Sequence, residues 1–273
     1  MKARKVLWMM VAILICGAMV FTSCSNDDKD SNINNLSEKI IGKWIISDID
    51  GRPALTNDKT VLTFPSATMA YVSESKADYA GPAVKWSPAR EYEALIDGNK
   101  VTLTGHPTKI NTIINEYVVT SITADEMACA YKHTVIRNDQ VIKVTEMQLR
   151  FTKVTSDYSE SVLGLWECTE LTGIETFNDA NARLEFFADG TYKYWRKNDV
   201  GEWEAVTTRE FQDYFVDGTL LATRWKNQGE DELREWWEIA SIANGQMVWN
   251  ALRQNTDGST AQQGMKWQRV LFN

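Results

Sequence analysis

Side chains that could carry out acid–base, nucleophilic or metal chemistry are scarce in this 273-residue chain. His106 and His133 are the only histidines, and neither has a cysteine, histidine or carboxylate at metal-ligand spacing. The sequence contains no Gly-x-Ser-x-Gly elbow, no phosphate-binding glycine loop and no His-Glu-x-x-His motif. We therefore expect no catalytic residue, no metal site and no cofactor, and we expect that the protein is not an enzyme.

The cysteines do not indicate a catalytic or metal site. Cys16 lies in the N-terminal apolar run, and Cys129 and Cys168 lie in the body of the chain. Two cysteines make neither a disulfide framework nor a zinc site. A single bridge between Cys129 and Cys168 stays open, but two separate buried thiols are favoured because a free cysteine behaves as a small hydrophobe.

Tryptophan is distributed unevenly and is the main candidate for ligand contact. The first half of the main chain holds only Trp44 and Trp86. The second half holds Trp166, Trp195, Trp203, Trp225, Trp236, Trp237, Trp249 and Trp267. Either these indoles fill a core, or some of them form a binding face for sugars, lipids or a protein.

The neighbouring residues Trp236 and Trp237 help to distinguish core packing from a binding face. If the segment is a strand, adjacent side chains face opposite sides, so both indoles cannot line one core. One of them is expected to lie outward or at a mouth. We take Trp195, Trp225 and Trp236 as candidate ligand-binding residues.

The first 23 residues have the order of a secretory signal peptide: Lys2, Arg4 and Lys5 precede the apolar run 6–20. The residues before Cys24 resemble the lipobox of bacterial lipoproteins, with Phe21 where that family usually has leucine. The resemblance implies cleavage before Cys24, acylation of that cysteine by palmitate and other chains, and attachment to the outer membrane. An uncleaved membrane anchor is the alternative, although the apolar run is short for a full span.

Residues 24–39 are predicted to be a flexible acidic tether, because they are polar and cannot form a core. The acidic residues just after Cys24 resemble the export signal of surface lipoproteins of Bacteroidota, which implies exposure on the cell surface. A solvated spacer is the simpler interpretation. Loss of Lys2, Arg4 and Lys5 would change the net charge from −8 to −11. Nucleic acid is therefore not an expected partner.

The chain repeats itself. Gly42 and Trp44 recur as Gly164 and Trp166, an offset of 122 residues, and four further segments recur in the same order at offsets from 116 to 122. This period exceeds that of solenoid repeats. It predicts two tandem copies of a small domain, at 40–154 and 162–273, joined by a short linker at 155–161.

Each copy reads as a series of antiparallel strands. Asx-Gly pairs such as Asp97-Gly98 and Asn244-Gly245 separate runs rich in β-branched and aromatic residues, which is a strong hairpin signal. The segment 230–245 also fits a helix. Its counterpart in the first copy is rich in Val, Ile and Thr, so we predict strands for both.

About eight short strands that begin with Gly-x-Trp resemble the lipocalin-like (calycin) barrel. The resemblance implies two tandem eight-stranded barrels, closed at one end by Trp44 and Trp166. It also implies a basic residue from the last strand over each ring, Lys153 and Arg269. The alternative is that both tryptophans are ordinary core residues of an unrelated sandwich.

These observations favour a membrane-anchored binding protein for a small apolar or glycan-like ligand. The alternative is a structural or interaction module of an envelope complex without a small-molecule ligand. A fold alone does not fix the function, so neither the ligand nor a protein partner follows from the sequence.

Overall fold

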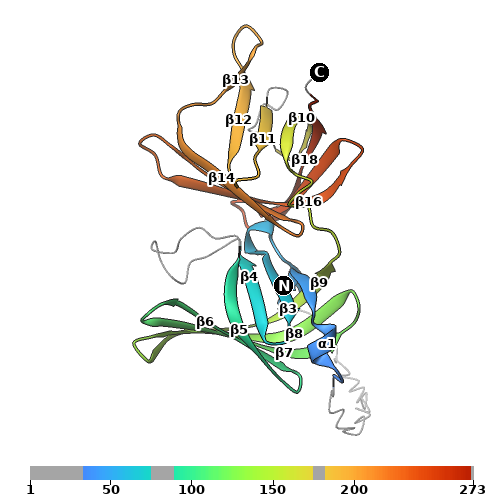
Figure 1. Ribbon diagram of the computed structural model, residues 1–273, viewed down its shortest axis with the longest axis vertical. Coiled ribbons are helices and arrows are strands. Elements are labelled where there is room, and N and C mark those ends of the chain that lie inside the picture. The colour runs from blue at the N-terminus through green and yellow to red at the C-terminus, as the bar shows by residue number, and fades with distance from the viewer. Residues whose placement is uncertain (1–32, 75–88, 175–181, 272–273) are drawn as a thin grey trace, which may run out of the picture. The chain divides into compact units, whose positions relative to one another are not determined.

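The computed structural model describes residues 33–74, 89–174 and 182–271, which form an all-β structure with two short helical turns. Two nine-stranded antiparallel sheets follow each other along the chain, drawn in blue to green and in yellow to red in Figure 1. Both belong to one compact unit, Ser31–Asn273. Within the described ranges, no helix is long and apolar enough to cross a membrane. The predicted signal peptide and Cys24 lie outside the described residues.

The first sheet closes into an eight-stranded barrel. Neighbouring strands pair in chain order, and the last strand returns to the first through pairs such as Trp44 with Lys153. The two-residue β2 adds to β1 outside this ring. The elements are α1 (Leu36–Lys39), β1 (Gly42–Ile49), β2 (Arg52–Pro53), η1 (Thr56–Asp58), β3 (Thr60–Ser66), β4 (Met69–Glu74), β5 (Arg90–Asp97), β6 (Lys100–Thr108), β7 (Asn111–Ile122), β8 (Glu126–Arg137) and β9 (Gln140–Val154).

The second sheet is a curled half-barrel. Its elements are β10 (Gly164–Thr172), β11 (Ala182–Phe186), β12 (Tyr192–Lys197), β13 (Trp203–Ala205), β14 (Arg209–Asp217), β15 (Leu220–Asn227), β16 (Glu232–Ala243), β17 (Gln246–Gln254) and β18 (Thr260–Arg269). The short β13 pairs with the edge of β12. In the described part of the chain, β12 and β14 form no strand ladder. The isolated bridge between Thr191 and Asp213 lies where their ladder would be, and the Tyr214 N–H donates to the Gly190 carbonyl beside it. The prediction of a second closed eight-stranded barrel is therefore wrong, because β13 occupies the edge that β4 offers to β5 in the first barrel.

Both sheets carry the same irregularity. The β1–β9 ladder shifts between Ile46 and Asp48, and the β10–β18 ladder shifts between Cys168 and Glu170, 122 residues later. The β7–β8 and β16–β17 ladders also shift at equivalent places. Because β-bulges are specific features of a fold, their repetition supports the duplication seen in the sequence.

The structure gives the first Gly-x-Trp motif a physical reason. Trp44 is fully buried, and its indole N–H donates to the Ile40 carbonyl at 2.7 Å. The Lys153 ammonium lies 4.1 Å from the centroid of the Trp44 ring. Gly42 has a φ of 113°, and a Cβ there would lie 2.9 Å from Lys153 Nζ. Glycine thus permits both the backbone conformation and the passage of the cation over the indole.

The second copy repeats this arrangement. The Trp166 indole N–H donates to the Val162 carbonyl at 2.7 Å, and the Arg269 guanidinium lies 4.1 Å from the ring centroid. Gly164 has a φ of 109°, and a Cβ there would lie 2.8 Å from Arg269 Nη1. Trp44 with Lys153 and Trp166 with Arg269 therefore form two equivalent cation–π pairs, one in each sheet.

Segments predicted to be a tether and a linker contact the two cores. Helix α1 lies within 24–39, and its Leu36 is buried in the first core, so ordered structure starts before residue 40. In the segment 155–161, Tyr158 packs against the second core and its N–H donates to the Gly218 carbonyl at 3.1 Å. Both segments are anchored because each supplies an apolar side chain that can be removed from water.

The two sheets touch through their outer faces. Ile45, Val61 and Leu220 form a small buried cluster, and Trp236 packs against it. Beside them, the buried Asp217 accepts hydrogen bonds from the Lys43 ammonium and the Ser73 hydroxyl of the first barrel. Trp236 thus faces outward from its own sheet and meets the first barrel.

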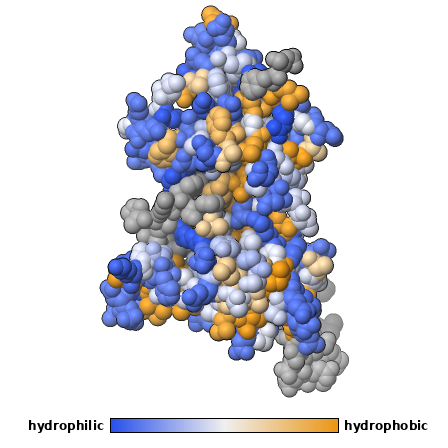
Figure 2. All heavy atoms as spheres, in the orientation of Figure 1, coloured by the Kyte–Doolittle hydropathy of each residue, from blue (hydrophilic) through white to orange (hydrophobic). Residues whose placement is uncertain are grey.

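The cysteines and the exposed apolar residues do not indicate a site. Cys129 and Cys168 are free thiols, each buried in its own core. Burial raises the pKa of the Cys129 thiol to about 12, so it is protonated at neutral pH. Figure 2 shows apolar residues interspersed with hydrophilic ones on the face in view. Single exposed apolar residues are normal on protein surfaces.

Candidate functional site

The second sheet contains a cavity of about 590 Å³. Most of its lining comes from this sheet, and one residue of the first barrel, Asn57 of η1, contributes to it. The other lining residues are Ile174, Leu184, Tyr192, Tyr194, Arg209, Thr223, Trp225, Arg234, Glu235, Trp236, Trp237, Trp249, Arg253, Gln263, Met265 and Trp267. Aromatic rings and a few charged groups thus define its chemistry.

Three indoles cluster on one wall of the cavity. The Trp249 ring centroid lies 5.8 Å from that of Trp237 and 4.8 Å from that of Trp267. All three residues are buried. The indole N–H groups of Trp249 and Trp267 have no acceptor among the described residues. Because a buried donor without an acceptor costs free energy, a ligand oxygen that reached these groups would bind favourably.

Arg209, at the start of β14, lies among aromatic residues. Its guanidinium is 5.0 Å from the Tyr194 ring centroid and 5.1 Å from that of Trp225. Its Nη1 donates to Gln212 Oε1 at 2.9 Å and to the Tyr192 hydroxyl at 3.4 Å. Burial raises the pKa of the Tyr192 phenol far above its ordinary value, and the nearby charge of Arg209 opposes this rise only in part. Tyr192 therefore remains a neutral phenol.

Arg253, on β17, is the second cation of the cavity. Its guanidinium lies 5.0 Å from the Trp237 ring centroid and donates to the Trp236 carbonyl. Desolvation lowers the pKa of this guanidinium, and the charge of Glu235 acts in the opposite direction. Arginine stays protonated in proteins, so Arg253 places a positive charge in an aromatic environment.

The structure brings two of the three predicted ligand-binding tryptophans to the cavity. Trp225 and Trp236 line it, and Trp195 does not. Trp195 follows Tyr194 on β12, where consecutive side chains face opposite sides, so it lies on the outer face of the sheet. Trp236 also packs between the sheets, which gives this indole a structural role.

The two copies differ at equivalent positions of β8 and β17. The 120-residue offset places Ala251 at the position of Tyr131, and Arg253 at that of His133. In the first barrel, Asn115 Oδ1 bonds to the Tyr131 hydroxyl at 2.7 Å and to His133 Nδ1 at 2.8 Å. A polar network thus occupies the first barrel where the second has a small residue and an arginine.

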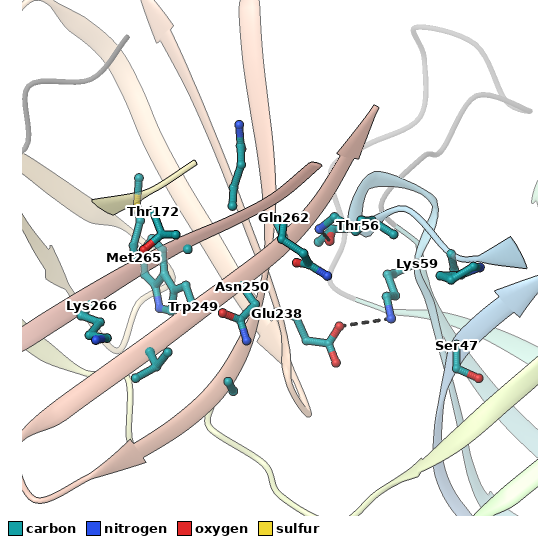
Figure 3. Close-up of a pocket in the computed structure, with 18 residues that line it drawn as sticks. Ser47, Thr56, Lys59, Thr172, Glu238, Trp249, Asn250, Gln262, Met265 and Lys266 are labelled. Carbon is teal, nitrogen blue, oxygen red and sulfur yellow. Dashed lines mark hydrogen bonds and ion pairs between the residues drawn. The ribbon is translucent and has the colours of Figure 1, made fainter. Parts of the chain in front are cut away.

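A second hollow, of about 530 Å³, lies between the sheets and is shown in Figure 3. The figure shows Lys59 reaching from the first barrel to Glu238, and the two groups form an ion pair at 3.1 Å. Nearby, the Leu252 N–H donates to Thr56 Oγ1 at 2.8 Å. Because these bonds join the sheets, we assign this hollow to the contact between them and take the aromatic cavity as the candidate site.

Sequence reasoning missed Arg209 and Arg253. An arginine in a strand looks like a solvated surface residue until its face and its partners are known. For Arg253 a signal was present: Met247, Trp249 and Ala251 alternate on one face of β17, and the next residue on that face is Arg253. A ladder irregularity lies between Arg209 and Phe211, so alternation along β14 gives no comparable signal for Arg209.

Comparison with known proteins adds a distant likeness. No protein-family model matches the chain, and no curated protein matches it. Among solved structures, it is similar to a "putative outer membrane protein" from Bacteroides fragilis NCTC 9343 at 9% identity and a TM-score of 0.23. That match covers 87% of this chain and 100% of the other. A similarity this low does not indicate a function.

Proposed function

We propose that the protein is a lipoprotein of the outer membrane whose second sheet binds a small apolar or glycan-like ligand without transforming it. The observation that carries this proposal is the aromatic cavity. Its volume of about 590 Å³ falls in the range typical of small-molecule sites, and seven of its lining residues are Tyr or Trp. Aromatic faces of this kind stack on sugar rings and on apolar groups.

We also propose that both sheets are of the lipocalin-like type. It is supported by the closed ring of the first sheet and by the repeated Gly-x-Trp with a cation over each indole. On this assignment the first barrel, with its internal polar network, is a filled scaffold, and the second is the binding unit.

The ligand hypothesis predicts a specific loss on removal of one indole. In the mature chain 24–273 carrying Cys24→Ser, we expect a member of a glycan and lipid panel to change the tryptophan fluorescence. Trp225→Ala should then weaken that binding by about 30-fold, the effect of a contact worth about 2 kcal/mol. Isothermal calorimetry on each variant checks the affinity.

Trp195→Ala is the matched control, because this indole lies on the same sheet but not in the cavity. Equal losses for both variants, or a panel that leaves the fluorescence and calorimetric signals unchanged, would count against a ligand in the cavity.

The anchor is tested separately at Cys24. In intact cells, the wild-type protein should incorporate labelled palmitate and enter the detergent phase of Triton X-114, because several acyl chains at one residue anchor stably. Cys24→Ser should lose the label and stay in the aqueous phase. Detergent partitioning that did not change would indicate an uncleaved apolar anchor, and protease treatment of whole cells reports which side the protein faces.

A further inference from the structure

The cavity holds positive charge that the protein does not neutralise. Arg209 forms no ion pair with a carboxylate among the described residues; its acceptors there are the Gln212 amide and the Tyr192 hydroxyl. Both bonds use Nη1, which leaves the Nε and Nη2 donors for another group. A partly desolvated cation that meets only neutral acceptors lies in an unfavourable environment.

Other arginines of the same sheet are paired. Arg183 binds Glu167, Arg224 binds Asp213, and Arg196 binds Glu204. Within the cavity lining, Arg234 is paired with Glu232. Arg269, over Trp166, pairs with no carboxylate among the described residues either, but it donates to two backbone carbonyls. Within the described ranges, Arg209 and Arg253 are the cavity arginines without a carboxylate hydrogen-bond partner, in a chain whose net charge is −8.

Glu235 is the acidic residue of the cavity lining, and it offsets part of this charge. It acts electrostatically on Arg253 and accepts the Trp237 indole N–H at 3.4 Å. Counting Arg234 as neutralised, the lining retains Arg209 and Arg253 against Glu235, an excess of one positive charge.

We propose that the ligand of the second sheet is an amphipathic anion, with a carboxylate- or sulfonate-type head bound by Arg209 and a ring or apolar body against the indole cluster. This inference rests on the proposed function and names its ligand class. The planar guanidinium suits such a head because it presents paired donors to two oxygens. Arg253 adds attraction, and the indole N–H groups of Trp249 and Trp267 can donate to further oxygens.

Two fluorescent probes separate the anion from the apolar body. The probe 1-anilinonaphthalene-8-sulfonate carries a sulfonate, and N-phenyl-1-naphthylamine has the same ring system without it. With the mature chain 24–273 carrying Cys24→Ser, we expect the sulfonate probe to bind at least 10-fold more tightly. A charged hydrogen bond worth about 1.5–3 kcal/mol corresponds to about 10-fold or more.

Variants assign that difference to a residue. Arg209→Met should weaken binding of the sulfonate probe about 10-fold or more and change binding of the neutral probe less than about 2-fold. Arg209→Lys should retain part of the preference for the sulfonate probe, because the positive charge remains while the paired N–H donors of the guanidinium are lost. Arg196→Met, a surface arginine of the same sheet paired with Glu204, should leave both affinities unchanged. Circular dichroism and thermal melting of each variant establish that it folds. If Arg209→Met does not fold, Arg209→Lys is used as the test variant in its place.

The outcomes distinguish the two proposals. If the neutral probe binds as tightly as the sulfonate, or Arg209 variants weaken both probes equally, the anionic class is overturned while a ligand cavity remains. If neither probe binds and no panel compound changes the tryptophan fluorescence or the calorimetric signal, the proposed function itself fails. A sulfonate preference that survives in Arg209→Met but disappears in Arg253→Met would also overturn the assignment to Arg209.

Discussion

Replacing Trp166 with alanine is expected to lower the free energy of unfolding of the second sheet by about 3–5 kcal/mol, the cost typical of removing a fully buried large aromatic side chain. The side chain is fully buried, and its N–H bond to the Val162 carbonyl would be lost. Arg269 would also lose the ring beneath its guanidinium, which lies 4.1 Å from the centroid.

Urea unfolding followed by circular dichroism measures this loss. Trp44→Ala should cost a similar amount in the first barrel, because Trp44 has the same burial, the same type of N–H bond and a cation at the same distance. Trp195→Ala, which is only partly buried, is the control and should cost less. A loss below about 1 kcal/mol for Trp166→Ala would show that the indole is not a central packing element.

Removing the Asp217 carboxylate is expected to weaken the contact between the two sheets. Asp217→Ala should lower the free energy of unfolding by about 2–3 kcal/mol, because it removes the acceptor shared by Lys43 and Ser73 at a largely buried position. The cost is kept moderate because Lys43 retains Asp157 at 3.3 Å. Asp217→Asn should cost less, since the amide oxygen still accepts.

The pH dependence of this contact has a defined sign. Desolvation alone would lower the pKa of Lys43, but hydrogen bonds and charge from Asp217 and Asp157 outweigh it and raise the pKa above 10.5. A raised pKa in the folded state gives stability that is complete below pH 10.5 and is lost as the pH rises through the folded-state value. The difference between wild type and Asp217→Ala should therefore shrink in strongly alkaline buffer.

Glu170→Ala is the comparison for Asp217→Ala. Glu170 pairs with Lys266 at 2.8 Å, but both side chains are about half exposed, so its loss should cost less than about 1 kcal/mol. Equal effects of the two substitutions would mean that the Asp217 contact is no more than a surface ion pair.

Sequence reasoning reached the strands because local patterns specify them. The segment 230–245 also fits a helix by its spacing, but it contains the strand β16, which is hydrogen-bonded on both sides, to β15 and β17. Strands β11 and β12 form a hairpin in which Leu184 pairs with Tyr194 and Phe186 with Tyr192. The alternation of apolar and polar residues and the types of the turn residues are local patterns, so they can be recognised in a single sequence.

The opening of the second sheet could not be predicted from the same patterns. Strands β13 and β14 follow β12 closely in the chain and compete for the same edge, and strand patterns alone do not decide which of them pairs with it. The cavity has a similar origin, because Ala251 leaves space only if its neighbours do not fill it. The role of Trp236 also needed the first barrel, since its partners Ile45 and Val61 belong to the other sheet.

The cavity of the second sheet is lined in part by the first barrel. Asn57 of η1 contributes to its lining, and the Leu252 N–H of β17 donates to Thr56 in the same turn. A fragment cut at residue 162 would therefore lack a piece of the wall and leave a backbone donor without its acceptor. The two sheets are therefore not interchangeable modules, and excising the C-terminal half would change the wall of the pocket it was meant to isolate.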